Sequence, residues 1–112
     1  MFGINEIDSQ ILKTWKDEGK SIRLIDVRSH NEISQGMIHG GEPLPLNLLP
    51  LRATGIDSEH DLVFYCRTGA RSAQACSYMM QNGFNKVYNL RGGIIDWVRS
   101  GNGIVMPVEQ IA

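Results

Sequence analysis

Short apolar segments alternate with segments of helical periodicity along the chain. Residues 22–27, 62–66 and 87–90, with the sequences IRLIDV, LVFYC and VYNL, are short apolar runs that predict strands. These runs do not alternate in polarity, which is typical of parallel strands covered on both faces. A fourth short strand is expected around residues 44–48, in a stretch rich in Gly and Pro, with a helical turn after Pro50.

Capping and stop signals delimit the expected helices. These helices are one between Asp8 and Gly19, a short one between the capping-box pair Ser29/Glu32 and Gly36, one within 73–84 that Gly83 ends, and one from Ile94 to Gly101. Because strands and helices alternate, the predicted fold class is α/β, with a small, mostly parallel sheet flanked by helices on both faces.

The composition indicates one domain and excludes several classes of partner. The 112 residues suffice for one core, so residues 1–112 are expected to form a single domain. Eleven Lys and Arg against twelve Asp and Glu give a net charge of -1, which lacks the basic footprint of a nucleic-acid-binding protein. No apolar run approaches the roughly 18 residues of a membrane span, and the start MFGINEIDSQ lacks a secretory signal. We therefore expect a cytoplasmic protein without nucleic acid or membrane partners.

The cysteines and histidines narrow the possible chemistry. In a reducing cytoplasm, two cysteines indicate a reactive thiol and a buried one, not a disulfide framework. Cys76 shares a helical face with Ala73 and Met80, so we expect it to pack in the core. The three histidines lack metal-ligand spacing, and neither a metal nor another cofactor is expected.

Charged and nucleophilic side chains follow the carboxyl ends of the predicted strands. Asp26 and Arg28 follow the first clear strand, Cys66 ends the second, and Arg91 follows the last. In parallel α/β sheets, sites form at the carboxyl ends of the strands. These four side chains are therefore candidates for one shared crevice.

Cys66 begins the loop CRTGAR, which joins a buried strand to a helix. The loop amides, the helix dipole and the guanidinium groups of Arg67 and Arg71 all favour the thiolate, and such settings lower a cysteine pKa from about 8.5 toward roughly 3.5 to 7.5. Gly69 accepts the positive φ that turns backbone N–H groups inward. A cysteine after an apolar strand is often an inert core residue instead, but such a residue would gain nothing from these neighbours.

The loop could bind either a tetrahedral oxyanion or a sulfur anion. Cysteine phosphatases place five residues between the cysteine and an arginine that clamps the phosphate oxygens. Here five residues lead from Cys66 to Ser72, and the arginine comes one position early, at Arg71. This shorter loop fits one extra sulfur atom better than a phosphoryl group.

Three segments together resemble the rhodanese-like sulfurtransferases of single-domain type. LIDVRSHNEISQGMIHGG is similar to the first signature of that family, YCRTGARSA to its active-site loop and LRGGIIDW to its carboxyl-terminal signature. They occur in the family's order and spacing and cover nearly the whole chain. Two positions depart from the first signature, because Met37 replaces the usual histidine and His39 a common proline.

The resemblance implies a five-stranded sheet and a persulfide on Cys66. The expected donor is a small anionic sulfur compound, namely thiosulfate, a polysulfide or a persulfide, and the expected acceptor is a thiol, cyanide or a sulfur-carrier protein. The loop residues that would bind the transferred sulfur are Arg67, Thr68, Gly69, Ala70, Arg71 and Ser72. Arg67 would attract anionic donors at the loop mouth, and Arg71 would either face the substrate or pair with Asp26. Asp26 and Arg28 would support the loop or form only a structural pair.

Two other functions compete with this one. The domain could act as a persulfide carrier that relays sulfur to a protein partner, with little turnover of small donors. A cysteine phosphatase or arsenate reductase is the third reading, and the loop length opposes it.

Overall fold

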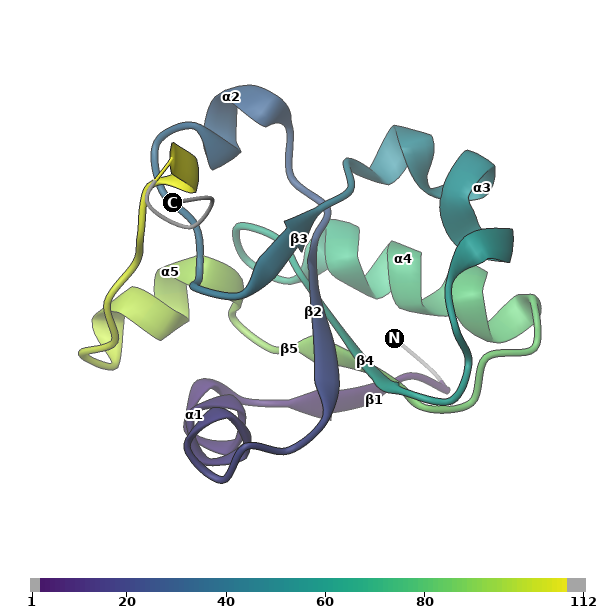
Figure 1. Cartoon of the computed structure of the whole chain (residues 1–112), viewed down its shortest axis with the longest axis horizontal. Helices are drawn as coiled ribbons and strands as arrows, with labels where there is room; N and C mark the ends of the chain where they lie inside the picture. The colour runs from purple at the N-terminus through teal and green to yellow at the C-terminus, as the bar shows by residue number, and fades with distance from the viewer. Residues whose placement is uncertain (1–2, 109–112) are drawn as a thin grey trace.

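Five parallel strands form a single sheet in the order β1-β5-β4-β2-β3 (Figure 1). The computed structural model describes residues 3–108. The strands are β1 (Asn5–Ile7), β2 (Ile22–Asp26), β3 (Gly41–Pro43), β4 (Asp61–Tyr65) and β5 (Val87–Leu90). The α-helices are α1 (Ser9–Asp17), α2 (His30–Ile33), α3 (Leu49–Arg52), α4 (Ala70–Gln81) and α5 (Gly93–Arg99), and Leu46–Leu48 and Ala53–Gly55 are 3-10 turns.

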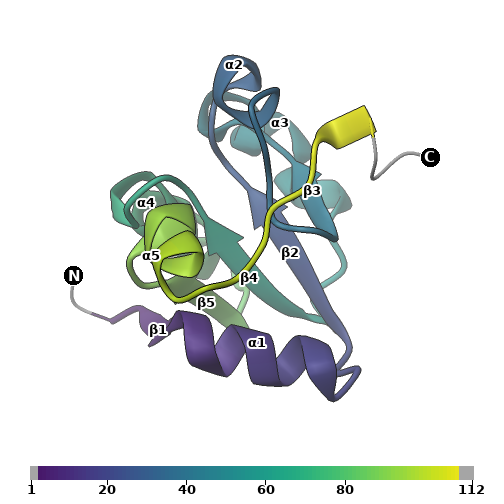
Figure 2. The ribbon, with the colours of Figure 1, turned by 90° about the vertical axis from the view of Figure 1, so that its left-hand side faces the viewer.

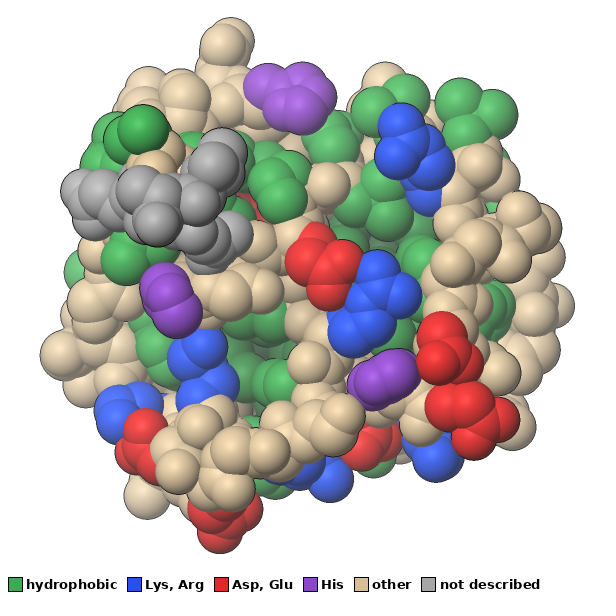
Figure 3. Space-filling model, viewed as in Figure 1, with side chains coloured by type: hydrophobic (Ala, Val, Ile, Leu, Met, Phe, Trp, Pro, Cys, Tyr) green, Lys and Arg blue, Asp and Glu red, His purple; other side chains and the backbone are tan. Residues whose placement is uncertain are grey.

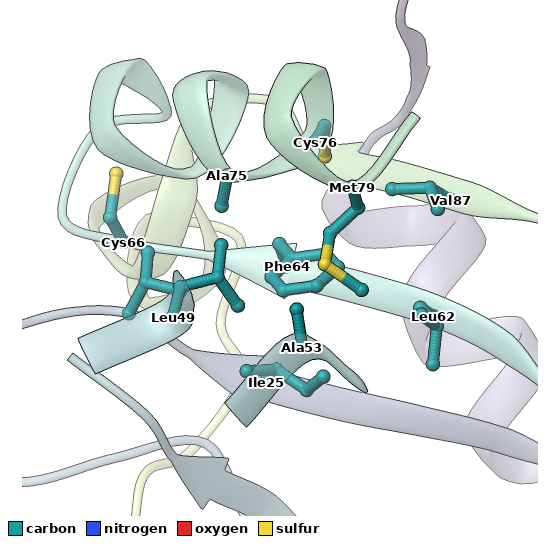
Figure 4. Close-up of a cluster of buried hydrophobic side chains, with 11 residues drawn as sticks. Ile25, Leu49, Ala53, Leu62, Phe64, Cys66, Ala75, Cys76, Met79 and Val87 are labelled. Carbon is teal, nitrogen blue, oxygen red and sulfur yellow. The ribbon is translucent and has the colours of Figure 1, made fainter. Parts of the chain in front are cut away.

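Helices cover both faces of the sheet, as expected. In Figure 1, α1 and α5 lie to one side of the strands and α3 and α4 to the other, and Figure 2 shows α1 and α5 from their own side. Each face has its own buried cluster: Leu12 and Trp97 pack on one face, and Phe64 and Met79 belong to the other, which Figure 4 shows. The short helix α2 follows the carboxyl end of β2 and contributes no residue to either cluster.

The strands expected at 22–27, 62–66 and 87–90 are confirmed to within one residue as β2, β4 and β5. The strand expected at 44–48 is wrong, since β3 lies at Gly41–Pro43 and the predicted segment turns into a 3-10 helix. Pro45 has no N–H to donate, and only the amides on either side of it reach the end of β2, from Leu44 to the Asp26 carbonyl and from Leu46 to that of Val27.

Strand β1 was not predicted. It has three residues and pairs only with β5, at the edge of the sheet. A run this short has no period of its own to detect, and its strand character comes from the partner strand.

The helix caps confirm the local signals. The Asp8 carboxylate accepts a hydrogen bond of 2.9 Å from the Ile11 amide, and Ser29 and Glu32 form the complete capping box. Helix α4 begins at Ala70, three residues before the expected start, because Gly69 serves as its N-cap with φ of +111°. The second half of the predicted loop is therefore the first turn of a helix.

The surface shows no concentration of charge on the face drawn in Figure 3, where acidic and basic side chains are interspersed among apolar ones. This distribution agrees with the net charge of -1. Among residues 3–108, none of the helices is both long enough and apolar enough to pass through a bilayer.

Candidate active site

The loop after β4 directs hydrogen-bond donors at the sulfur of Cys66. The amide of Gly69 lies 3.1 Å from Sγ, and both the amide and the hydroxyl oxygen of Ser72 lie 3.4 Å from it. Figure 4 shows the sulfur pointing toward the amino-terminal end of α4, while Cys76 lies further along the same helix. The loop therefore has the curled form, with its N–H groups inside, that the sequence predicts.

Helix α5 holds the loop in this form from outside. The Ile94 amide donates to the Cys66 carbonyl at 2.9 Å and the Ile95 amide donates to the Arg67 carbonyl at 3.2 Å. In a trans peptide the C=O and N–H groups point in opposite directions, so anchoring these two carbonyls on α5 turns the following N–H groups away from it. The first turn of α5 thus helps to orient the amide of Thr68, one of those that stabilise the Cys66 thiolate.

Gly93 makes this close approach possible. A Cβ at Gly93 would lie within 2.6 Å of the Cys66 carbonyl oxygen and closer still to the Arg67 carbonyl oxygen, and the residue has φ of +60°. Both conditions exclude a side chain. Gly93 therefore lets α5 pack directly onto the active-site loop.

The thiol of Cys66 is buried but its environment favours ionisation. Burial alone would raise its pKa, yet hydrogen bonds from the Ser72 hydroxyl and from the amides of Ser72, Gly69 and Thr68 together hold the pKa below its ordinary value. Only 1% of the residue is exposed. The sulfur is thus enclosed by donors that are aimed at it, so burial does not make it an inert core thiol.

Cys76 is the contrasting case. It is fully buried in the cluster under α4, and burial raises its pKa to about 12. This burial confirms its expected packing role.

Arg71 pairs with Glu32, so the pairing with Asp26, one of the two arrangements considered for it, does not occur. Its two terminal nitrogens lie 2.7 and 2.8 Å from the two carboxylate oxygens of Glu32. Arg71 holds the pKa of Glu32 down, at about 2. This bidentate pair ties the first turn of α4 to α2, and the same Glu32 completes the capping box with Ser29.

Asp26 is occupied by Arg28. The Arg28 guanidinium contacts both carboxylate oxygens, at 3.0 and 2.7 Å for the shortest bond to each, and donates to the Gly36 carbonyl at 2.7 Å. Both residues are buried. They form the structural pair that was one of the two expectations. Because Arg28 occupies the Asp26 carboxylate, Asp26 does not pair with Arg71.

Of the remaining residues proposed from the sequence, three lie beside Cys66 and one, Arg91, lies away from the site. Arg67, Thr68 and Ala70 are exposed on the loop. Arg67 lines a cavity of about 230 Å³ between α2 and α5, together with Glu32, Gln35, Ile95, Val98 and Ile104. Arg91 is not part of the site, because its guanidinium lies 3.7 Å from the Asp8 carboxylate at the start of α1.

Asn89 contacts the site and was not predicted from the sequence. It lies on β5, is 2% exposed, and its side-chain oxygen accepts a hydrogen bond of 2.5 Å from the Ser72 hydroxyl. The available signal was a lone amide in the apolar run VYNL, since a polar side chain in a doubly covered strand needs a partner.

Comparison with known proteins agrees with this geometry. Residues 8–100 match the rhodanese-like domain family. The chain is 49% identical to a sulfurtransferase of Allochromatium vinosum over 93% of this chain and 97% of that protein. It is 34% identical to the putative sulfurtransferase YtwF of Bacillus subtilis over 84% of this chain and 90% of that one. The crystal structure of a rhodanese-like domain protein from Staphylococcus aureus superposes with a TM-score of 0.83 at 26% identity, covering 92% of this chain and 98% of that one. Since the match spans nearly every element that builds the site, the chain belongs to the rhodanese-like domain family and is a sulfurtransferase-like member of it.

Proposed function

We propose that the chain moves sulfane sulfur from a small anionic donor to a thiophilic acceptor through a persulfide on Cys66. The observation that carries the proposal is the pair of backbone amides aimed at Sγ, from Gly69 at 3.1 Å and from Ser72 at 3.4 Å. These donors stabilise the thiolate, so the nucleophile needs no general base.

The first half-reaction loads the cysteine. The Cys66 thiolate attacks the outer sulfur of thiosulfate, a polysulfide or a persulfide, and the bond between the two donor sulfurs breaks. Its electron pair leaves with sulfite or with a thiolate, and the outer sulfur remains on Cys66 as a negatively charged persulfide. The amides of the loop residues 67–72 would stabilise that charge.

The second half-reaction unloads it. A thiolate or cyanide attacks the outer sulfur, the bond to Sγ breaks, and its electron pair returns to Cys66 as the thiolate. The same donors that favour the resting thiolate therefore stabilise the leaving group, and the cycle needs no external oxidant or reductant.

The Arg71–Glu32 pair favours sulfur transfer over phosphoryl transfer. A cysteine phosphatase uses the arginine of its loop to clamp phosphate oxygens. In this chain both terminal nitrogens of Arg71 are engaged by the Glu32 carboxylate, at 2.7 and 2.8 Å. The guanidinium therefore braces the loop, and the exposed Arg67 remains as the cation that an anionic donor would meet.

Intact-protein mass tests the proposal. After incubation with thiosulfate or polysulfide, the unmodified chain and the matched control Cys76→Ser should gain one sulfur atom that a reductant removes, and Cys66→Ser should gain none. Thiocyanate formation from thiosulfate and cyanide should likewise require Cys66. Sulfur retained by Cys66→Ser, or phosphate release from an aryl phosphate without any persulfide, would contradict the proposal. A persulfide that forms without small-donor turnover would assign the relay function instead.

A further inference from the structure

The neighbours of Asn89 determine which end of its side-chain amide is the nitrogen and which is the oxygen. Its amide nitrogen lies 3.0 Å from the Glu6 carboxylate and 3.2 Å from the Gly69 carbonyl oxygen. Both neighbours are acceptors, so this end must be the NH2 group. The other end, the carbonyl oxygen Oδ1, therefore faces Ser72.

The Ser72 hydroxyl has one hydrogen and two acceptors within reach. Its oxygen lies 2.5 Å from Asn89 Oδ1 and 3.4 Å from Cys66 Sγ. Because Oδ1 can only accept, the short contact requires the hydroxyl to donate to Asn89. The Cys66 thiolate still accepts hydrogen bonds from the loop amides, but it competes with Asn89 Oδ1 for the hydroxyl hydrogen of Ser72.

We propose that Asn89 is a positioning residue that draws the hydroxyl hydrogen of Ser72 away from Sγ and so limits how strongly the Cys66 thiolate is stabilised. This inference rests on the proposed role of Cys66 as the nucleophile. A thiolate with fewer hydrogen bonds is more basic and more nucleophilic, which favours attack on the donor sulfur.

Of the charged groups near Cys66, Glu6 is the one that contacts Asn89, and it loses a hydrogen bond when Asn89 is replaced. On β2, Asp26 and Arg28 satisfy each other. On α4, Arg71 is engaged with Glu32 of α2. On the loop Arg67 is exposed, and on β1 Glu6 contacts the amide of Asn89. A shift of the Cys66 pKa on replacing Asn89 can therefore come from the Ser72 hydroxyl, the loop backbone or Glu6, and the Ser72→Ala background separates the hydroxyl from the other two.

The test measures the pH midpoint of Cys66 alkylation by iodoacetamide, followed by mass, in a cycle of Asn89→Leu, Ser72→Ala and the double variant. Asn89→Leu frees the hydroxyl for the thiolate, so the midpoint should fall by about 0.5 to 1 pH unit. Ser72→Ala keeps the backbone amide but removes the hydroxyl, and in that background Asn89→Leu should leave the midpoint unchanged.

A merely structural role for Asn89 predicts the opposite sign. Loss of its bond to the Gly69 carbonyl would loosen the loop, and the midpoint would rise in both backgrounds; that result would overturn the inference. Asn89→Ala, which removes the same bonds with a smaller side chain, repeats the measurement if Asn89→Leu does not fold. Alkylation needs no sulfur donor, so a shifted midpoint in a chain that never forms a persulfide would refute the proposed function and leave this inference intact.

Discussion

Replacing Gly93 by alanine tests whether α5 shapes the active-site loop. The new Cβ would lie 2.5 Å from the carbonyl carbon of Arg67 and 2.6 Å from the carbonyl oxygen of Cys66. These are backbone atoms, so no rotamer change can relieve the contact. Either α5 must withdraw from the loop or the Cys66–Arg67 segment must move, and both changes disturb the hydrogen bonds from Ile94 and Ile95.

The expected loss of stability has two parts. Holding alanine at φ of +60° costs about 1 to 2 kcal/mol. Weakening the two hydrogen bonds between α5 and the loop adds about 1 kcal/mol each. Gly93→Ala should therefore destabilise the fold by about 3 to 4 kcal/mol.

Gly101→Ala is the matched control at the other end of α5. Gly101 has φ of +90°, and a Cβ there would have no atom within 4 Å, so only the backbone part of about 1 to 2 kcal/mol applies. Urea unfolding gives the two free energies of unfolding, and the alkylation rate of Cys66 at neutral pH shows whether the loop has changed. Equal destabilisation by the two variants, with the thiol equally reactive in both, would refute the role assigned to Gly93.

Two further predictions concern the charged groups of the loop. Glu32→Gln should cost less than about 1 kcal/mol of stability, because the Arg71–Glu32 pair is about one third exposed (36% and 30%). The same variant should slow sulfur transfer, because it frees Arg71. The control Asp17→Asn breaks an exposed pair on α1 and should leave the rate unchanged. Arg71 lowers the Glu32 pKa from 4.5 to about 2, so the stability difference between the unmodified chain and Glu32→Gln should be complete above pH 4.5 and shrink as the pH falls toward 2, and a difference that grows in acid would contradict the pairing. Arg67→Ala should raise KM for thiosulfate and leave KM for an uncharged organic trisulfide unaffected, with the thiosulfate effect weakening as salt is added; an equal rise for both donors would show that Arg67 does not act by charge.

The short-range features of the fold could be predicted because their causes lie within a few residues. The apolar runs that became β2, β4 and β5 were visible directly, and so was the capping box, whose partners are three residues apart. The curled form of the loop after β4 was predictable for the same reason, since Cys66 and Gly69 are three residues apart, although the start of α4 was expected three residues too late.

The partners of the site residues were not predictable from spacing. Arg71 and Glu32 are separated by 39 residues, and a sequence containing several acidic residues gives no means of choosing Glu32 over Asp26. Asn89 is 17 residues from Ser72, and it reaches the site only because β5 lies next to β4 in the sheet.

The sequence by itself thus determined the α/β class, the family resemblance and a cysteine at the start of a helix, because periodicity, caps and loop length act locally. The tertiary structure alone decided which groups complete the site: Glu32 for Arg71, Asn89 for the Ser72 hydroxyl, and the first turn of α5 for the loop carbonyls. The physical reason is that hydrogen-bond partners of buried polar groups are chosen by the order of strands and the packing of helices, which local propensity does not encode.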